Sequence, residues 1–259
     1  MSLKTMEILG AFVTALLLSS NANADVSEGI LNYKFPNGIL YNHVRLSGEI
    51  SESDLKYIRM TVEYFKSQNY NPLFLELNAH GTNIYPAMKI GKIVKEEAAT
   101  VGVTEKNDCI GTCIYVLAAG TRRYYSYMGT IAVMYPDEAD VDGNTAYEDS
   151  LNYFAEMRVS DMLAGHIFNA DRLDDRALDK HSLALFELGT YGQELKEQKD
   201  QEWADKIGMP IAEFREKKIN YDQESSDCQV LRDGMDCWAK VAKKNDIWYP
   251  GINDAIFSQ

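Results

Sequence analysis

The first half of the chain alternates between short apolar runs and stretches in which apolar residues recur every three or four positions. Residues 44–48 and 73–77 are mostly apolar, as is typical of strands, and residues 101–103 form a shorter run. Four apolar residues recur at helical spacing between the first two runs: Leu55, Ile58, Val62 and Phe65. A second helix is expected to begin near Pro86, because proline suits the first turn of a helix. Strands that alternate with helices in this way predict βαβ units on a parallel sheet.

A sharp corner is predicted at residues 109–113 (CIGTC), after the third apolar run and directly before the nearly all-apolar residues 114–120. Gly111 can adopt backbone angles closed to other residues, which suits a turn from strand to helix. The helix expected after it has no polar face, so it belongs in the core. Many hydrolases present a nucleophilic serine at such a corner. Here no serine is present at the tip.

The pattern of apolar and charged residues changes in the second half of the chain. Residues 122–127 and 130–135 are two more strand candidates, and residues 147–168 and 182–207 are long, charged helical patterns. Shorter helices are expected over residues 210–218 and 237–242. The stretch 139–145, rich in Asp and Gly, is the best candidate for a linker.

The N-terminus predicts export. Lys4 precedes an apolar run over residues 8–18, and the triplet Ala22-Asn23-Ala24 follows it. A basic start, a short apolar stretch and an A-x-A site are typical of a secretory signal peptide, here residues 1–24, cleaved after Ala24. The alternative is a retained membrane anchor, but the run is too short for an ordinary span. We therefore expect a periplasmic or secreted protein with no stable membrane insertion after cleavage.

Export makes the four cysteines potential disulfide partners. Local pairing, Cys109 with Cys113 and Cys228 with Cys237, is the simplest of the three connectivities that four cysteines allow. A reactive thiol pair at 109 and 113 is the alternative. Neither pair has C-x-x-C spacing, so no metal site is expected, and no motif indicates a cofactor. The net charge of −13 argues against nucleic acid as a partner.

Three stretches resemble landmarks of the Clp protease/crotonase superfamily: residues 46–50 (LSGEI), 77–82 (LNAHGT) and 109–113. The similarity covers roughly residues 44–136 and is greatest to secreted, Clp-protease-like bacterial proteins whose corner reads C-x-S-x-C. The resemblance implies an α/β fold of stacked β-β-α units, with a core over residues 25–138. A helical C-terminal region over residues 139–259 would complete or extend that core. It also implies catalysis by Ser, His and Asp, and assembly into homo-oligomers.

The residues at the corresponding catalytic positions indicate a degenerate site. In the family, the serine lies nine residues before the glycine that ends the corner helix. That glycine is Gly120 here, so the serine position is Gly111. The family histidine lies two residues before a proline, and the residue two before Pro136 is Met134. Glycine has no nucleophilic oxygen and methionine has no basic nitrogen. Asp246 could occupy the position of the family acid, with no histidine to orient.

The oxyanion loop is only partly kept. Asn78 and Gly81 match the family pattern of Asn-Ser-Pro-Gly-Gly, whereas His80 replaces the proline and Thr82 replaces the second glycine. Thr112 is the best substitute nucleophile, with His80 as its base, but threonine at the start of a helix is more often an N-cap.

The sequence therefore predicts a non-catalytic protein that binds a peptide or protein partner. A peptidase or other hydrolase using Thr112 is the alternative. A third class, an acyl-CoA enzyme, suits an exported protein poorly, because that cofactor is cytosolic.

Overall fold

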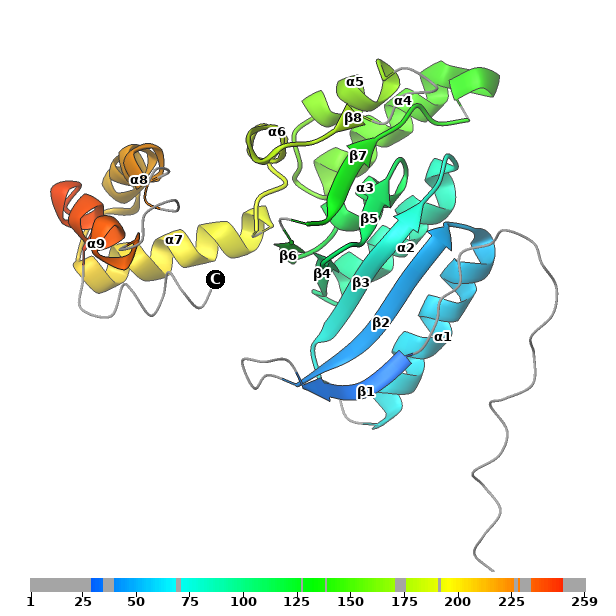
Figure 1. Cartoon of the computed structure of the whole chain (residues 1–259), viewed down its shortest axis with the longest axis horizontal. Coiled ribbons are helices and arrows are strands. Elements are labelled where there is room, and N and C mark those ends of the chain that lie inside the picture. The colour runs from blue at the N-terminus through cyan, green and yellow to red at the C-terminus, as the bar shows by residue number, and fades with distance from the viewer. Residues whose placement is uncertain are drawn as a thin grey trace, which may run out of the picture.

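The computed structural model describes residues 29–34, 40–68, 71–126, 128–137, 139–170, 176–190, 192–225, 228 and 234–248. They form a mixed α/β molecule with a largely parallel sheet and, beyond it, a separate group of helices (Figure 1). The signal peptide expected over residues 1–24 lies outside the described residues. Among the described residues, no helix combines the length and apolar character needed to cross a membrane.

The first part of the chain forms the strands and helices that its apolar pattern predicts. Its elements are β1 (Gly29–Lys34), β2 (Leu40–Glu49), α1 (Glu52–Gln68), β3 (Leu73–His80), α2 (Ile84–Glu96), β4 (Thr100–Val103), β5 (Asp108–Ile110), α3 (Cys113–Ala118), β6 (Arg122–Tyr125) and β7 (Thr130–Val133). At the start of α1, the Ser51 N–H donates to Asp54 Oδ2 at 2.7 Å, a contact of the capping-box type. Ile58, Val62 and Phe65 form the buried side of α1.

The sheet forks at β3. Along its whole length β3 pairs in parallel with β2. On its other side, its first half pairs with β4, through Leu75 and Val101, whereas its last residues pair with β5, through Ala79 and Cys109. One branch continues from β4 to β6 and the other from β5 to β7. The elements β4–β5–α3 and β6–β7–α4 are thus successive units of two strands and a helix, which confirms the predicted fold class.

Helix α3 lies at the centre of the core. Every residue from Cys113 to Ala118 is at most 1% exposed, as expected for a helix without a polar face. Arg123, on β6, is buried at 2% exposure and closes the C-terminal end of this helix. Its guanidinium donates to the carbonyl oxygens of Leu117 and Ala118, and also to those of Glu187 and Gly189. The cation thereby joins α3 to a loop about 65 residues later in the chain.

The first elements of the second half of the chain complete this core, and the later helices lie outside it. Its elements are α4 (Ala139–Glu156), α5 (Met162–Phe168), β8 (Arg176–Ala177) and α6 (Lys180–Leu185). Phe154, Leu163 and Leu188 belong to the same hydrophobic cluster as α3. The linker predicted at residues 139–145 is wrong, because that stretch is the first part of α4. The single helix predicted over residues 147–168 is broken between α4 and α5, where Arg158 adopts a φ of 54°.

The last three helices form a group with a hydrophobic cluster of their own. They are α7 (Gln193–Ile207), α8 (Ile211–Ser225) and α9 (Gly234–Lys244). Figure 1 shows α7 running away from the sheet, with α8 and α9 packed along its far half. The cluster contains Trp203 from α7, Phe214 and Tyr221 from α8, Ala242 from α9 and the following Ile247.

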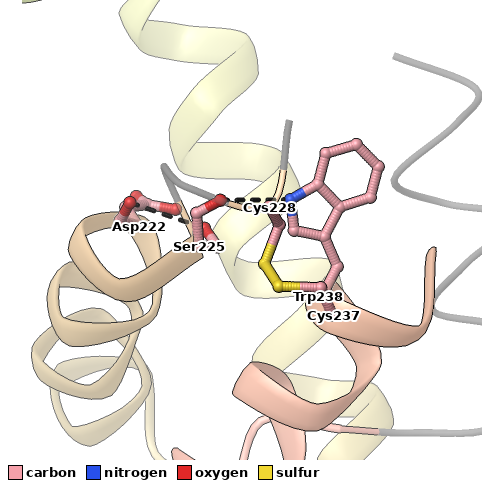
Figure 2. The surroundings of a disulfide bond; sticks show 5 residues. All are labelled: Asp222, Ser225, Cys228, Cys237 and Trp238. Carbon is pink, nitrogen blue, oxygen red and sulfur yellow. Dashed lines mark hydrogen bonds between the residues drawn. A yellow bond between two sulfur atoms is a disulfide. The ribbon is translucent and has the colours of Figure 1, made fainter. Parts of the chain in front are cut away.

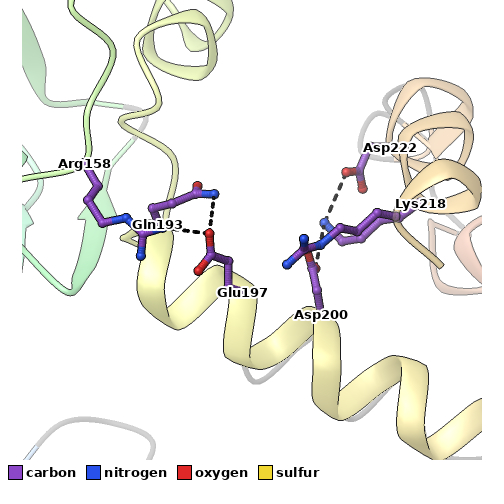
Figure 3. A network of polar contacts seen from close by, with 7 residues as sticks. Arg158, Gln193, Glu197, Asp200, Lys218 and Asp222 are labelled. Atoms are coloured by element: carbon purple, nitrogen blue, oxygen red, sulfur yellow. Dashed lines mark hydrogen bonds and ion pairs between the residues drawn. The ribbon is translucent and has the colours of Figure 1, made fainter. Parts of the chain in front are cut away.

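Polar contacts hold the first turns and the middle of α7. At its start, Arg158 forms an ion pair with Glu197, at 2.9 Å; further along, the buried carboxylate of Asp200 lies 3.6 Å from Lys218 Nζ of α8 (Figure 3). The predicted disulfide between Cys228 and Cys237 closes the connection between α8 and α9 (Figure 2).

Candidate functional site

The corner after β5 contains a glycine whose backbone only glycine adopts readily. Gly111 has a φ of +62°, and its N–H donates to Ala132 O of β7 at 2.9 Å. A Cβ at this position would lie 2.3 Å from Gly81 O and 3.1 Å from Met134 Cε. The corner is therefore closed to any nucleophilic side chain at position 111 unless the backbone shifts.

The structure brings Met134 against this corner, as the motif spacing predicts. Met134 follows β7, and the contact of its terminal methyl group with the empty side-chain position of Gly111 places the two residues together. In a serine-type site the general base must lie within hydrogen-bond reach of the nucleophile. Here the two facing positions carry a thioether and a hydrogen atom, so neither can transfer a proton.

The backbone donor of the corner already has a partner. The Thr112 N–H donates to Gly81 O at 2.9 Å. In corners of this kind, the N–H of the residue after the nucleophile is one of the donors that stabilise an oxyanion. The Gly81 carbonyl thus already accepts the hydrogen bond that this N–H would offer to an oxyanion.

Thr112 is buried at 1% exposure at the N-cap position of α3. Its side chain makes no capping hydrogen bond, and Thr112 Oγ1 has no hydrogen-bond partner among the described residues. The hydroxyl packs against Gly81, where an added Cβ would approach it to 2.6 Å. His80 is exposed at the end of β3 and makes no hydrogen bond to this hydroxyl.

Two residues that the resemblance assigns to the oxyanion loop, Asn78 within β3 and Thr82 just after it, act as structural ties. Asn78 Oδ1 accepts a hydrogen bond from Asp108 N, at 3.1 Å, which joins β3 to the start of β5. Thr82 Oγ1 donates to Asp137 Oδ2 at 2.6 Å, and Thr82 O accepts from Asp137 N at 3.2 Å. The end of β3 is thereby held to β5, and the loop between β3 and α2 is held to the segment after β7.

The disulfide between Cys109 and Cys113 confirms the predicted pairing. The two Cα atoms lie 5.2 Å apart, and both side chains are fully buried. The bridge spans Gly111 and braces the corner from within the core. Among the described residues no group of three or more His, Cys, Asp or Glu side chains is arranged to hold a metal ion.

Asp246 is far from this corner. It follows α9, in the helical group that Figure 1 shows away from α3, and its exposed carboxylate lies 3.3 Å from Lys217 Nζ of α8. Asp246 thus stabilises the contact between α8 and α9, and the structure does not bring it to the positions expected for a catalytic triad.

Sequence reasoning missed a polar cluster around Glu76. His43 Nε2 lies 2.9 Å from Glu76 Oε2, and Asn107 Nδ2 donates to Glu76 Oε1 at 2.8 Å. The hydrogen bond from His43 is the largest of the effects that lower the pKa of Glu76 to about 2. Glu76 is therefore an ionised anchor near neutral pH, unsuited to proton transfer. His43 lies within β2, directly before the apolar run at residues 44–48.

Comparisons with known proteins give structural likenesses only. No family model and no curated protein matches the chain. ClpP1 from Listeria monocytogenes is 14% identical, with a TM-score of 0.46 over 56% of this chain and 87% of that one. A mutant of the 1510-N membrane-bound stomatin-specific protease in complex with a substrate peptide is 10% identical, with a TM-score of 0.44 over 56% and 70%.

A third solved structure resembles more of the chain. A probable enoyl-CoA hydratase/isomerase from Mycobacterium abscessus is 14% identical over 91% of this chain and 94% of its own, with a TM-score of 0.39. With TM-scores below 0.5, these similarities assign no activity, substrate or partner to this protein.

Proposed function

We propose that this protein is a non-catalytic, Clp-protease-like protein of the periplasm or the extracellular space that binds a peptide or protein partner. The observation that carries the proposal is the closed corner. The side-chain position of Gly111 is occupied by Gly81 O, and the base position is Met134. A serine-type mechanism needs a nucleophile, a base and free oxyanion donors, and this corner supplies none of them.

The other contacts of the corner stabilise its conformation. The 109–113 disulfide, the Asn78–Asp108 hydrogen bond and the Thr82–Asp137 pair all hold the loops around it in place. A rigid frame without catalytic groups suits recognition, since a preorganised surface loses little conformational entropy on binding. The two disulfides and the A-x-A site after the apolar N-terminal run support export.

The experiment is a peptidase and esterase assay of the mature, oxidised protein beside its Thr112→Ala variant. We expect turnover of fluorogenic peptides and p-nitrophenyl esters to equal the buffer rate for both proteins. Turnover that disappears in Thr112→Ala would replace the proposal with a threonine hydrolase. Turnover that both proteins share would also contradict the proposal, and would indicate a site away from the corner.

The resemblance to oligomeric relatives supports a further part of the proposal, the assembly of several copies of the chain. Sedimentation equilibrium of the mature protein at several concentrations tests it. A single species with the mass of one chain at all concentrations would reject assembly and leave the non-catalytic role standing.

A further inference from the structure

A groove with a volume of about 280 Å³ lies between α2 and α4, away from the corner. Met88 of α2 and Tyr153 of α4 form its floor, at 8% and 3% exposure. Lys89 and Asn152 stand on its two walls. Of the described residues that line it, none belongs to the corner.

Two polar bridges close the ends of this groove. Tyr85 Oη donates to Asp149 Oδ2 at 3.2 Å, and Lys92 Nζ lies 3.5 Å from Glu156 Oε2. In each helix the second bridging residue comes seven positions after the first, so α2 and α4 run in the same direction along the groove. Seven residues of helix correspond to about 10 Å of length. An extended peptide rises about 3.3 Å per residue, so roughly three residues fit between the bridges.

The floor of the groove is held rigidly from below. Tyr153 crosses α2 at Gly91, where a Cβ would lie only 1.8 Å from its hydroxyl oxygen. The hydroxyl then donates to Tyr115 O of α3 at 2.7 Å. The absence of a side chain at Gly91 therefore lets the Tyr153 ring reach the core, and the groove exists before any ligand binds.

The charges of the groove are unequally matched. Lys89 forms an ion pair with Glu52 at 2.5 Å, and Lys92 is paired with Glu156. Asp149, by contrast, accepts its hydrogen bond from the neutral Tyr85 hydroxyl and forms no ion pair among the described residues. Within the part of the chain that the structure describes, the carboxylate at the Tyr85 end of the groove is thus not matched by a cation. The net charge of −13 adds a long-range attraction for cationic ligands.

We propose that this groove binds an extended peptide segment of about three residues, in which an apolar residue adjoins a lysine or arginine. The apolar side chain packs on Met88 and Tyr153, the cation pairs with Asp149, and the peptide amides face Asn152. This inference rests on the proposed function, since it identifies the site and the chemistry of the peptide partner.

The test uses the full mature chain and two probes, acetyl-Gly-Leu-Arg-Gly-amide and acetyl-Gly-Leu-Glu-Gly-amide, with a photoreactive leucine for cross-linking. We expect the arginine peptide to bind at least tenfold more tightly by titration calorimetry, and less tightly as salt is added. Its cross-links should fall on α2 and α4. Asp149→Asn, which retains an acceptor for Tyr85, should lose about tenfold of the affinity for the arginine peptide.

Glu148→Gln is the matched control, because it removes the same charge from the adjacent, exposed position of α4. We expect it to change the affinity less than twofold, and thermal melts of both variants to match the parent protein. Four results would each overturn the proposal that the groove binds this peptide. They are equal affinity for the two peptides, equal loss of affinity in the two variants, cross-links outside α2 and α4, and no binding at millimolar peptide. Cleavage of either peptide would instead overturn the proposed function, whatever the groove binds.

Discussion

Gly81 O lies where a side chain at Gly111 would begin, 2.3 Å from the position of its Cβ. The same oxygen accepts the hydrogen bond from Thr112 N, so one carbonyl group closes both the nucleophile position and the oxyanion donor. Introducing a serine at position 111 would therefore strain the backbone.

We predict that Gly111→Ala lowers the free energy of unfolding by about 2 kcal/mol or more. A residue with Cβ in the left-handed region costs about 1–2 kcal/mol, and the contact with Gly81 O adds to this cost. Urea unfolding measures the change. Gly165→Ala is the control, because that helical glycine has nothing within 4 Å of an added Cβ, and we expect stabilisation by about 0.5–1 kcal/mol. Equal stability of Gly111→Ala and the parent would show that the corner can relax.

We predict that Arg123→Met costs about 3 kcal/mol or more of stability. The substitution removes the guanidinium from four carbonyl acceptors and leaves the two at the end of α3 buried without that donor. Thermal and denaturant unfolding test it. Arg122→Met, at the exposed neighbouring position of β6, should stay within about 0.5 kcal/mol of the parent. Similar effects of the two changes would reject a structural role for the buried cation.

We predict a loss of stability at acidic pH that depends on Glu76. The pKa of this carboxyl group is about 2 in the folded protein, below the ordinary value of 4.5. On acidification the unfolded chain therefore takes up the proton first, and the stabilisation is present above pH 4.5 and lost as pH falls towards 2. The shift corresponds to about 3 kcal/mol at most. Urea unfolding between about pH 6 and pH 2 should show a shallower pH dependence in Glu76→Gln than in the parent; parallel curves would contradict the assignment.

We predict that both disulfides form in protein exported to the periplasm, and that the second stabilises more. Loop-closure entropy gives about 2 kcal/mol for the bridge between residues four apart and slightly under about 3 kcal/mol for the bridge between residues nine apart. Non-reducing peptide mapping checks the pairing, and unfolding of the two double Cys→Ser variants checks the order. Free thiols at all four positions, or pairing between Cys109 and Cys237, would refute the prediction.

The sequence could predict those elements that have a long apolar repeat or a distinctive cap or turn residue. The buried stripe of α1, the Ser51–Asp54 cap and the turn at Gly111 all depend on local chemistry that the sequence displays. Strand β5 is only three residues long and has no period to read. Residues 139–145 form a helix despite their Asp and Gly content, because they extend the packed part of α4, and extending a helix is easier than starting one.

Some features of the candidate site could likewise be predicted from local sequence, and others could not. The proximity of Gly111 and Met134 follows from motif spacing, whereas the Glu76 cluster joins residues from positions 43 to 107, which no local spacing connects. The groove between α2 and α4 depends on tertiary packing at Gly91 and Tyr153, 62 positions apart in the chain. Such sites become visible only when the helices are placed side by side.

Because β3 is the strand at which the sheet forks, both branches depend on its backbone hydrogen bonds, β4 on those of its first half and β5 on those of its last residues. Fraying that begins at an outer strand, β6 on one branch or β8 on the other, must travel inward before it reaches β3. Amides of the slowest class in hydrogen exchange should therefore cluster at Leu75 and Leu77, 1% and 0% exposed, and report the opening of the whole molecule. The corner at Gly111 should also open rarely, because Gly81, which contacts it, lies just beyond the end of β3.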